Sequence, residues 1–339
     1  MNKSKPKKMT DLSVDPMMLL QLHFSLAPSY ILRAAVELNV FSSLAKGHVN
    51  AAAMAKDLNL TERGTQYFLD TLVGLGLLKK VQKKYALTGL TRQFCVTGQP
   101  DYLGRFLLNN VDELWKDLPQ VVRSGVSKMR LEKEHESDEF FRELVQNLHI
   151  MNRLAAQTTA RTLKIGQTKE LNVLDMACGS GVWGIAMGEA YPQAQITFQD
   201  FPKMLGLTKE YIQKHNLSER ARFLPGDLKE TEFGENRFDV AILGNIVHSE
   251  GVRSSQILFR KIFEALRPKG RIVIADMIPH DDRSGPPFPL IFGLLMLVTT
   301  TEGGTYTLKE YKTWLKSAGF KNIHPVDIHS HSPLVVGER

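Results

Sequence analysis

The fold is decided by residues 171–184, which read Leu-Asn-Val-Leu-Asp-Met-Ala-Cys-Gly-Ser-Gly-Val-Trp-Gly. The apolar start of this stretch predicts a buried parallel strand with Asp175 at its carboxyl end. Small residues follow and lead into a helix-forming stretch from Ala186 to Ala190. Residues without bulk suit a turn at which a ligand approaches the backbone and meets the first amides of a helix. The stretch therefore predicts a ligand-binding loop between a strand and a helix.

The glycines of this loop match two kinds of cofactor site. Gly179, Gly181 and Gly184 form the Gly-x-Gly-x-x-Gly fingerprint of a dinucleotide site, which is a weak signal on its own. Asp175 separates the two possibilities, because a carboxylate ahead of the glycines repels a pyrophosphate and attracts an ammonium group. The pattern Asp-x-Ala-x-Gly-x-Gly, with Ala177 as its third residue, therefore favours S-adenosylmethionine.

The composition is that of a globular protein with two domains. The chain has 339 residues, of which 43% are hydrophobic and 23% are charged, and this length accommodates two domains of common size. The formal net charge is +7, but Lys3, Lys5, Lys7 and Lys8 supply four of these charges. The excess belongs mostly to a basic start, residues 1–14, which we expect to be disordered. The charge therefore does not indicate a nucleic-acid partner.

Targeting signals and cysteine usage favour the cytoplasm. The beginning of the chain lacks the apolar core of a signal peptide, and no apolar run reaches the roughly 20 residues that span a bilayer. The longest run, Pro289 to Val298, predicts a buried or pocket-lining helix. Cys95 and Cys178 are too few for a disulfide framework. We expect a cytoplasmic protein without a membrane partner.

Residues 15–100 predict a winged helix. Apolar residues recur at helical spacing from Met17 to Leu38 on more than one side, as expected of a helix covered by its own domain and by a second subunit. Two shorter helices, 51–58 and 61–75, precede a hairpin over residues 77–87. The second of these helices has only Arg63 near its start and is otherwise too apolar to read DNA. We therefore expect no nucleic-acid binding.

The rest of the chain predicts an α/β fold. A helical linker, residues 101–168, ends in a long amphipathic helix from Phe140 to Leu163 and leads into a second domain, residues 169–339. In this domain strands alternate with helices, as in a doubly wound, Rossmann-like parallel sheet. Strands are expected over 196–198, 222–224, 240–243 and 271–275, and an antiparallel edge over 321–326 and 334–337.

Ligands of such sheets bind beyond the carboxyl ends of the strands. Asp200 ends the second strand nineteen positions after Gly181, the spacing of an acid that accepts hydrogen bonds from ribose hydroxyls. After the third strand, Asp227 is expected at the adenine amino group and Leu228 on the face of its ring. The expected cofactor contacts are Asp175, Ala177, Gly179, Gly181, Asp200, Phe201, Gly226, Asp227, Leu228 and Asn245.

The ends of the fourth and fifth strands carry the candidates for catalysis. His248 follows the fourth strand, where the sulfonium methyl group would point, and is therefore expected to act as a general base. Asp276 ends the fifth strand and is expected to hold the imidazole.

The order of these features resembles the S-adenosylmethionine-dependent O-methyltransferases of the caffeic acid and hydroxyindole type. The match runs from about Leu19 to Val336 and includes the winged helix, the glycine loop, Asp200-Phe201-Pro202, Gly226-Asp227 and the histidine after the fourth strand. The resemblance implies a homodimer whose amino-terminal domain contributes to the partner's substrate pocket. It also implies methylation of a hydroxyl on a small aromatic or heteroaromatic metabolite of secondary metabolism, with His248 as the base and S-adenosylhomocysteine as a product.

The sequence departs from the family pattern in three places. One is Ser249, where the family commonly has an acidic residue directly after the histidine, while here Glu250 follows one place later. The first glycine of the family loop is Ala177 here, which should still admit the cofactor. The family holds its histidine with two acids, of which one matches Asp276 and the other lies in Gly-Gly-x-Glu-Arg-Thr. This chain has Glu302-Gly303-Gly304-Thr305-Tyr306-Thr307 there, so Glu302 or Tyr306 is the candidate substitute. The expected acceptor contacts are His149, Met151, Phe292 and Met296.

Other functions fit parts of the sequence. A carbon or nitrogen methyltransferase, or a cyclase that uses the sulfonium charge, would keep the cofactor. An NAD-dependent oxidoreductase would need a pyrophosphate beside Asp175, and a metabolite-sensing regulator would need a DNA-reading helix. The runs 280–282 and 329–331 contain histidine but lack the spacing of a structural zinc site, so no metal is expected.

Overall fold

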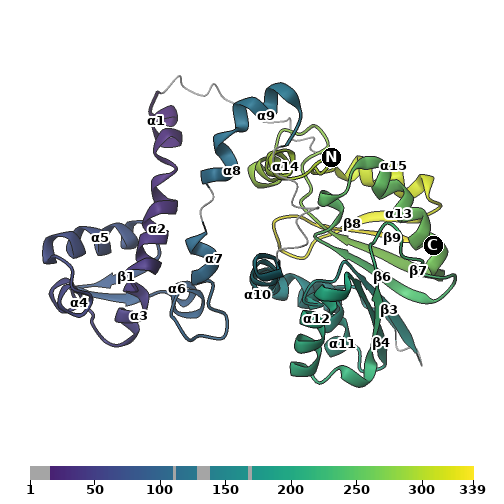
Figure 1. Cartoon of the computed structure of the whole chain (residues 1–339), viewed down its shortest axis with the longest axis horizontal. Helices are drawn as coiled ribbons and strands as arrows, with labels where there is room; N and C mark the ends of the chain where they lie inside the picture. Colours follow the sequence, from purple (N-terminus) through teal and green to yellow (C-terminus); the bar gives the residue numbers. More distant parts are fainter. Residues whose placement is uncertain (1–15, 110–111, 128–137, 167–169) are drawn as a thin grey trace, which may run out of the picture. The chain divides into compact units, whose positions relative to one another are not determined.

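The structure consists of two compact units, Met1–Asn110 and Val111–Arg339, which are described separately. The computed structural model describes residues 16–109, 112–127, 138–166 and 170–339, which are coloured in Figure 1. The basic start, residues 1–14, lies outside the described residues. Much of the stretch expected as a linker, residues 101–168, falls within the second unit.

Helices and one hairpin build the first unit. The two helices expected over 51–58 and 61–75 and the hairpin after them are present in the predicted order, whereas the helices over 40–45 and 89–94 were not predicted. Side-chain oxygens of Asn50 and Thr61 accept hydrogen bonds from the first-turn amides of Ala53 and Gly64, which fixes the beginnings of two helices. The core contains Phe41, Met54, Leu69, Leu72 and Tyr85. The elements are α1 (Pro16–Phe24), α2 (Ala27–Glu37), α3 (Val40–Ala45), α4 (Ala51–Leu58), α5 (Glu62–Gly74), β1 (Leu78–Val81), β2 (Lys84–Leu87), α6 (Gly89–Phe94) and α7 (Gly104–Leu108).

The single helix expected from Met17 to Leu38 is divided into α1 and α2. The Ser25 hydroxyl donates to the Leu22 carbonyl at the end of α1 (2.6 Å), and Pro28 occupies the first turn of α2. Proline suits a first turn because it lacks an amide hydrogen and has a fixed φ. A new helix therefore begins at this position.

A seven-stranded sheet forms the centre of the second unit, and it confirms the expected doubly wound fold. Its order is β5-β4-β3-β6-β7-β9-β8, with parallel pairing from β5 to β7 and antiparallel pairing of β9 with both neighbours. The strands are β3 (Leu171–Met176), β4 (Ala194–Asp200), β5 (Ala221–Pro225), β6 (Phe238–Gly244), β7 (Leu266–Ala275), β8 (Lys321–Val326) and β9 (Leu334–Glu338). The chain reverses its winding between β3 and β6, which is where ligands bind to such sheets.

Helices cover both faces of this sheet (Figure 1). Val173 packs on one face with α10 (Asp138–Thr162), α11 (Val182–Ala190) and α12 (Pro202–Lys214). The next residue, Leu174, packs on the other face with α13 (Val252–Ala265) and α15 (Leu308–Ser317). Both faces are buried, which explains the nearly continuous apolar runs in the strands. The remaining helices of the unit are α8 (Asp112–Lys116), α9 (Leu118–Ser124) and α14 (Pro287–Thr299).

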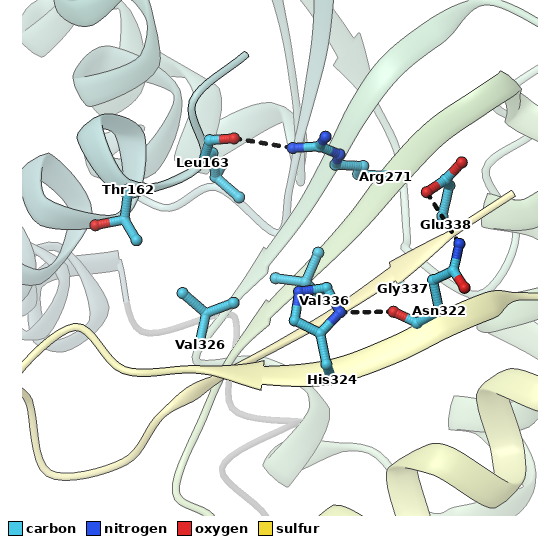
Figure 2. A pocket seen from close by; sticks show the side chains of 9 residues that line it. All are labelled: Thr162, Leu163, Arg271, Asn322, His324, Val326, Val336, Gly337 and Glu338. Carbon is cyan, nitrogen blue, oxygen red and sulfur yellow. Dashed lines mark hydrogen bonds between the residues drawn. The ribbon is translucent and has the colours of Figure 1, made fainter.

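A hollow lies at the end of the sheet that is opposite to the carboxyl ends of the parallel strands. Figure 2 shows Arg271 there, with its guanidinium directed at the Leu163 carbonyl at the end of α10, and the Nη1–O distance is 2.8 Å. His324 and Glu338 of the two antiparallel strands also line the hollow. None of the residues that the sequence predicts for a functional site lines it. Within the described residues, no helix has the length and apolar character needed to cross a membrane.

Gly184 sets the distance between α11 and the sheet. A Cβ at this position would lie 2.5 Å from the Phe198 ring, 2.8 Å from Ile196 and 2.9 Å from the Asp175 carboxylate. By contrast, a Cβ at Gly206 of α12 would meet nothing within 4 Å. Close packing on the sheet therefore requires a glycine at position 184, whereas a larger side chain would fit at position 206.

We expect Gly184→Ala to lower the free energy of unfolding by about 1–3 kcal/mol, because the added methyl group overpacks the contact between helix and sheet. Gly206→Ala is the matched control and should raise this free energy by roughly 0.5–1 kcal/mol, because alanine is the better helix former. Urea unfolding followed by circular dichroism measures both values. Equal effects of the two substitutions would contradict the close packing at Gly184.

Candidate active site

The loop after β3 has a backbone conformation that favours glycine. Gly179 and Gly181 have φ values of 55° and 77°, in the left-handed region. A Cβ at Gly181 would lie 2.9 Å from the Phe198 ring, and a Cβ at Gly179 would lie 3.2 Å from Val145 of α10. Ala177, which departs from the glycine pattern, has a φ of 46° and bears the strain that a glycine would avoid.

Asp175 lies beneath the loop and does not face the open strand ends as the sequence interpretation supposed. Its side chain is fully buried, and Oδ2 accepts a hydrogen bond from Gly184 N at the start of α11 (2.7 Å). Within the described residues, Oδ1 has no hydrogen-bond partner. Burial, reinforced by the charge of Asp200, raises the pKa of Asp175 to about 8. The carboxylate serves the amide of the helix start, so no exposed oxygen is left for a ligand's ammonium group.

The end of β4 holds the loop in place. Gln199 accepts hydrogen bonds from two loop amides, through its side chain from Ala177 N (3.1 Å) and through its carbonyl from Cys178 N (3.0 Å). Asp200 Oδ2 accepts from Gly179 N (2.7 Å). These three amides are therefore occupied by oxygens of the protein.

The loop fits a cationic nucleoside better than it fits a dinucleotide. A pyrophosphate site requires free amides at the turn, whereas three amides of this loop already donate to the end of β4. Two buried carboxylates, Asp175 and Asp200, also place negative charge against the loop when they are ionised. Burial raises the pKa of Asp200 to about 6, against the effect of its hydrogen bonds from Gly179 N and Phe201 N.

The turn after β5 is connected to the same strand end. Gly226 N donates to the Asp200 carbonyl (3.1 Å), which places Gly226 beside the loop. Asp227 Oδ1 accepts a hydrogen bond from Lys229 N (2.8 Å), and Leu228 is buried. The Asp227 carboxylate therefore stabilises its own turn and retains a second oxygen.

His149 of α10 packs on the glycine loop. Its Nδ1 lies 2.9 Å from the Ser180 hydroxyl, and its ring stacks on Tyr211 of α12 with a centroid distance of 4.2 Å. The side chain is buried. Of the two α10 residues expected at the acceptor, His149 is thus placed on the cofactor loop. Met151 is 44% exposed, and it points to the other side of the helix because it is two residues further on.

One face of α10 spans the strand ends. Val145, His149 and Asn152 have the spacing of residues that share a helix face. Val145 packs against Gly179, and the Asn152 side chain accepts a hydrogen bond from Asn245 Nδ2 just after β6 (2.9 Å). The helix therefore bridges the loop after β3 and the turn after β6.

His248 and Asp276 form a buried pair at the ends of β6 and β7. His248 Nδ1 lies 2.7 Å from Asp276 Oδ1, and His248 N donates to Oδ2 (2.9 Å). Met277 N also donates to Oδ1 (2.7 Å). An ionised carboxylate has only acceptors, so His248 Nδ1 must carry the hydrogen and Nε2 the lone pair. This tautomer is the one that a general base requires.

The segment with the expected second acid does not reach the imidazole. Glu302 is exposed, and within the described residues it makes no hydrogen bond or ion pair with His248. The Tyr306 hydroxyl donates to the Glu250 carbonyl (2.6 Å). Gly304 N donates to the His248 carbonyl (2.8 Å). The segment therefore supports the backbone of His248 and leaves its ring to Asp276.

The aromatic face of α14 adjoins the base. The Phe292 ring meets His248 edge to face, at a centroid distance of 4.9 Å and an interplanar angle of 86°. Met296, one turn further along, is buried. The structure thus brings Phe292 to the imidazole, and Met296 lies one turn further along α14.

Sequence reasoning missed three residues that hold these parts together: Gln199, Ser180 and Asn152. Gln199 precedes Asp200 at the strand end, so the rule that directed attention to Asp200 could also have found it. Ser180 and Asn152 gave no signal, because their roles depend on which face of α10 meets the sheet. Within the described residues, no cluster of three or more His, Cys, Asp or Glu side chains is arranged to hold a metal ion.

Known proteins are similar to this chain in sequence. A family model described as the O-methyltransferase domain matches residues 107–321, and one described as the O-methyltransferase dimerisation domain matches residues 20–97. The tetracenomycin polyketide synthesis 8-O-methyl transferase TcmO of Streptomyces glaucescens is 26% identical over 95% of this chain and 96% of its own. Human acetylserotonin O-methyltransferase is 27% identical over 87% of this chain and 89% of its own.

Solved structures have the same fold. A candidate O-methyltransferase from Nostoc punctiforme superposes with a TM-score of 0.83 at 28% identity, covering 99% of this chain and all of that one. Human N-acetylserotonin methyltransferase, solved with S-adenosylmethionine, superposes with a TM-score of 0.79 at 23% identity, covering all of this chain and 99% of that one. The family match extends over well more than half of the chain and includes the glycine loop and both members of the His248–Asp276 pair. The chain therefore belongs to the O-methyltransferase family, whose methyl donor is S-adenosylmethionine.

Proposed function

We propose that this enzyme methylates a hydroxyl group of a small aromatic or heteroaromatic metabolite, with His248 as the general base. The observation that carries the proposal is the buried His248–Asp276 pair beside the Phe292 ring. The names of several relatives specify hydroxyl methylation in tetracenomycin synthesis, on a naphthoate and on acetylserotonin. These names support a role in secondary metabolism for this chain as well.

The base works best when proton loss accompanies the reaction of the hydroxyl. A phenol has a pKa of about 10 and imidazole one of about 6.5, so complete deprotonation beforehand would cost roughly 5 kcal/mol. His248 Nε2 therefore accepts the proton as the oxygen reacts. Asp276 holds Nδ1 and stabilises the imidazolium that forms. When bound, S-adenosylmethionine supplies an electrophilic methyl group on a sulfonium cation.

The residues around the strand ends would hold this cofactor. We assign the ribose to Asp200, the adenine to Phe201, Asp227 and Leu228, and the remaining backbone contacts to Ala177, Gly179, Gly181, Gly226 and Asn245. Asp175, buried beneath the loop, would attract the positively charged cofactor through its own negative charge without contacting it. The support for these roles is the convergence of the loop, the Asp200 carboxylate and the Gly226 turn.

An apolar acceptor site suits the chemistry. Because the hydroxyl gives its proton to His248 as it reacts, the positive charge that enters with the cofactor passes to the imidazole, where Asp276 balances it. A site that excludes water strengthens this pairing. Phe292 lies directly at the base, and Met296 adds apolar bulk one turn further along α14. From α10, we assign Met151 to the acceptor site, and His149 to the same site through the glycine loop on which it packs.

We also propose that the enzyme is a cytoplasmic homodimer, with α1 at the interface. The chain has the dimerisation domain of the family. No α1 residue is buried, although the helix is mostly apolar, and Leu19 and Phe24 are 71% and 61% exposed. A second copy would remove this apolar surface from water.

The base assignment is tested with labelled S-adenosylmethionine and a panel of hydroxylated aromatics, in which the label should appear as an ether methyl group. His248→Ala should lower kcat by about two to four powers of ten while calorimetry shows unchanged cofactor affinity. Asp276→Asn should also lower kcat strongly, because the asparagine amide can present a donor to Nδ1. Glu302→Gln should lower kcat less than Asp276→Asn does. Wild-type turnover of His248→Ala would refute the base.

The ribose assignment gives a pH-dependent expectation. The pKa of Asp200 is raised to about 6, and the ionised carboxylate is the better acceptor for hydroxyl groups. Cofactor affinity should therefore rise as the pH increases from about 5 to about 7. Asp200→Asn should bind about tenfold more weakly at pH 7 and lack this rise. Calorimetry at several pH values measures both, and a wild-type pH dependence in Asp200→Asn would overturn the assignment.

The dimer interface is tested by sedimentation velocity. Leu19→Glu combined with Leu22→Glu should convert the dimer into a monomer, because two buried, unpaired charges would cost several kcal/mol. Tyr67→Glu on α5 is the control, since Tyr67 is also well exposed, at 68%, and lies outside α1. A dimer that survives the double substitution would show that α1 is not the interface.

A further inference from the structure

Four rings form a continuous aromatic row that begins at the base. Phe292 lies 4.9 Å from His248, Phe288 lies 6.2 Å from Phe292, and His331 lies 5.1 Å from Phe288, all between ring centroids. Phe288 and Phe292 are four residues apart and share one face of α14. The row therefore leads from the catalytic imidazole along the helix to a second imidazole.

The residue after His331 attaches its loop to the sheet. Ser332 is buried, and its Oγ accepts a hydrogen bond from Ile278 N (2.9 Å). Ile278 follows Asp276 by two residues, so this bond attaches the β8–β9 loop to the segment that leaves the catalytic pair. His331 itself is exposed, and within the described residues its imidazole makes no hydrogen bond. A ring that lies beside Phe288 and has unoccupied nitrogens is suited to contact a ligand.

The row has an open face. Phe288 is 47% exposed and Phe292 is partly exposed, although aromatic side chains are usually covered. A planar ring system that lies on these two phenylalanines would cover them and would bring its hydroxyl to His248. Its far end would then reach His331.

We propose that His331 is a specificity-determining residue of the acceptor site, and that the aromatic row selects a planar acceptor of at least two fused rings with a carboxylate or carbonyl oxygen remote from the methylated hydroxyl. This inference rests on the proposed function, because it takes His248 as the place of the hydroxyl. It goes further by giving the acceptor a minimum length and a second polar group.

The geometry explains both parts of this selection. Four helical residues correspond to a rise of about 6 Å, so a single ring on Phe292 would leave Phe288 and His331 uncovered. At His331, an imidazole N–H donates to an oxygen acceptor, most strongly when that oxygen is charged. The acid nearest in sequence, Asp327, pairs with His329 (3.5 Å) and is therefore engaged elsewhere in the loop.

The test compares acceptors that differ in one feature. The first is a hydroxynaphthoate with its hydroxyl and carboxylate on opposite rings, the second is the naphthol without the carboxylate, and the third is a one-ring hydroxybenzoate. The enzyme should use the hydroxynaphthoate with the highest kcat/KM. His331→Ala should raise the KM for the hydroxynaphthoate about tenfold and leave the naphthol unchanged, and His331→Gln, which keeps a donor, should retain part of the preference. His329→Ala, a neighbour with a 91% exposed side chain, is the matched control and should behave as wild type.

Binding measurements keep this inference separate from the base assignment. Fluorescence titration of hydroxynaphthoate into the enzyme loaded with S-adenosylhomocysteine reports recognition without turnover, and His331→Ala should weaken this binding by the same factor. No binding by the wild type, or equal binding by His331→Ala and the wild type, would overturn the inference. Wild-type turnover of His248→Ala would refute the base and leave the titration result standing.

Discussion

The hydrogen bonds from the glycine loop to the end of β4 are the constraint on which the rest of the site depends. The loop takes a left-handed course at Ala177, Gly179 and Gly181, and a backbone in that conformation must find acceptors for its amides outside regular structure. Gln199 and Asp200 provide the acceptors for Ala177, Cys178 and Gly179, while Gly181 N donates to the Cys178 carbonyl within the loop. The carbonyl of Asp200 also receives Gly226 N, so three consecutive strand ends are bonded into one surface. The start of α11 and the face of α10 are then placed by packing on this surface.

This construction buries acids, and burial has a cost that depends on pH. The pKa of Asp175 and that of Asp200 are raised to about 8 and about 6, so the folded chain holds these protons more tightly than the unfolded chain does. Their contribution to stability is therefore fully present at low pH and is lost as the pH rises through these values. A cationic ligand at the loop would offset the loss, because it favours the ionised carboxylates. In the proposed site, the same acids that weaken the free protein at neutral pH would favour a positively charged ligand.

The strand ends were predictable from the sequence, whereas the side-chain directions were not. Apolar periodicity located the parallel strands, and the rule that ligands bind at their carboxyl ends directed attention to Asp200, His248 and Asp276 before any contact was known. Asp175 was also placed at a strand end, but its turn toward Gly184 depends on the rotamer and on the need of α11 for an acceptor. His149 was found on a helix whose orientation on the sheet the sequence does not specify. The break between α1 and α2 had a visible cause in Pro28, and the expectation of one long helix overlooked it.

The two halves of the proposed site differ in charge, and this difference suits one half to the cofactor and the other to the acceptor. Carboxylates and carbonyls from β3, β4 and β5 form the half that would hold the cofactor, while the half beyond β6 is made of imidazole and apolar rings. A cation is stabilised in the first half, and a neutral hydroxyl loses little when it enters the second. Asp276, at the end of β7, accepts three hydrogen bonds from His248 and Met277, so its charge is held at the imidazole. In the proposed reaction the hydroxyl would meet the methyl group at the boundary between an acidic surface and an apolar one, and the positive charge would pass to the imidazole that Asp276 holds.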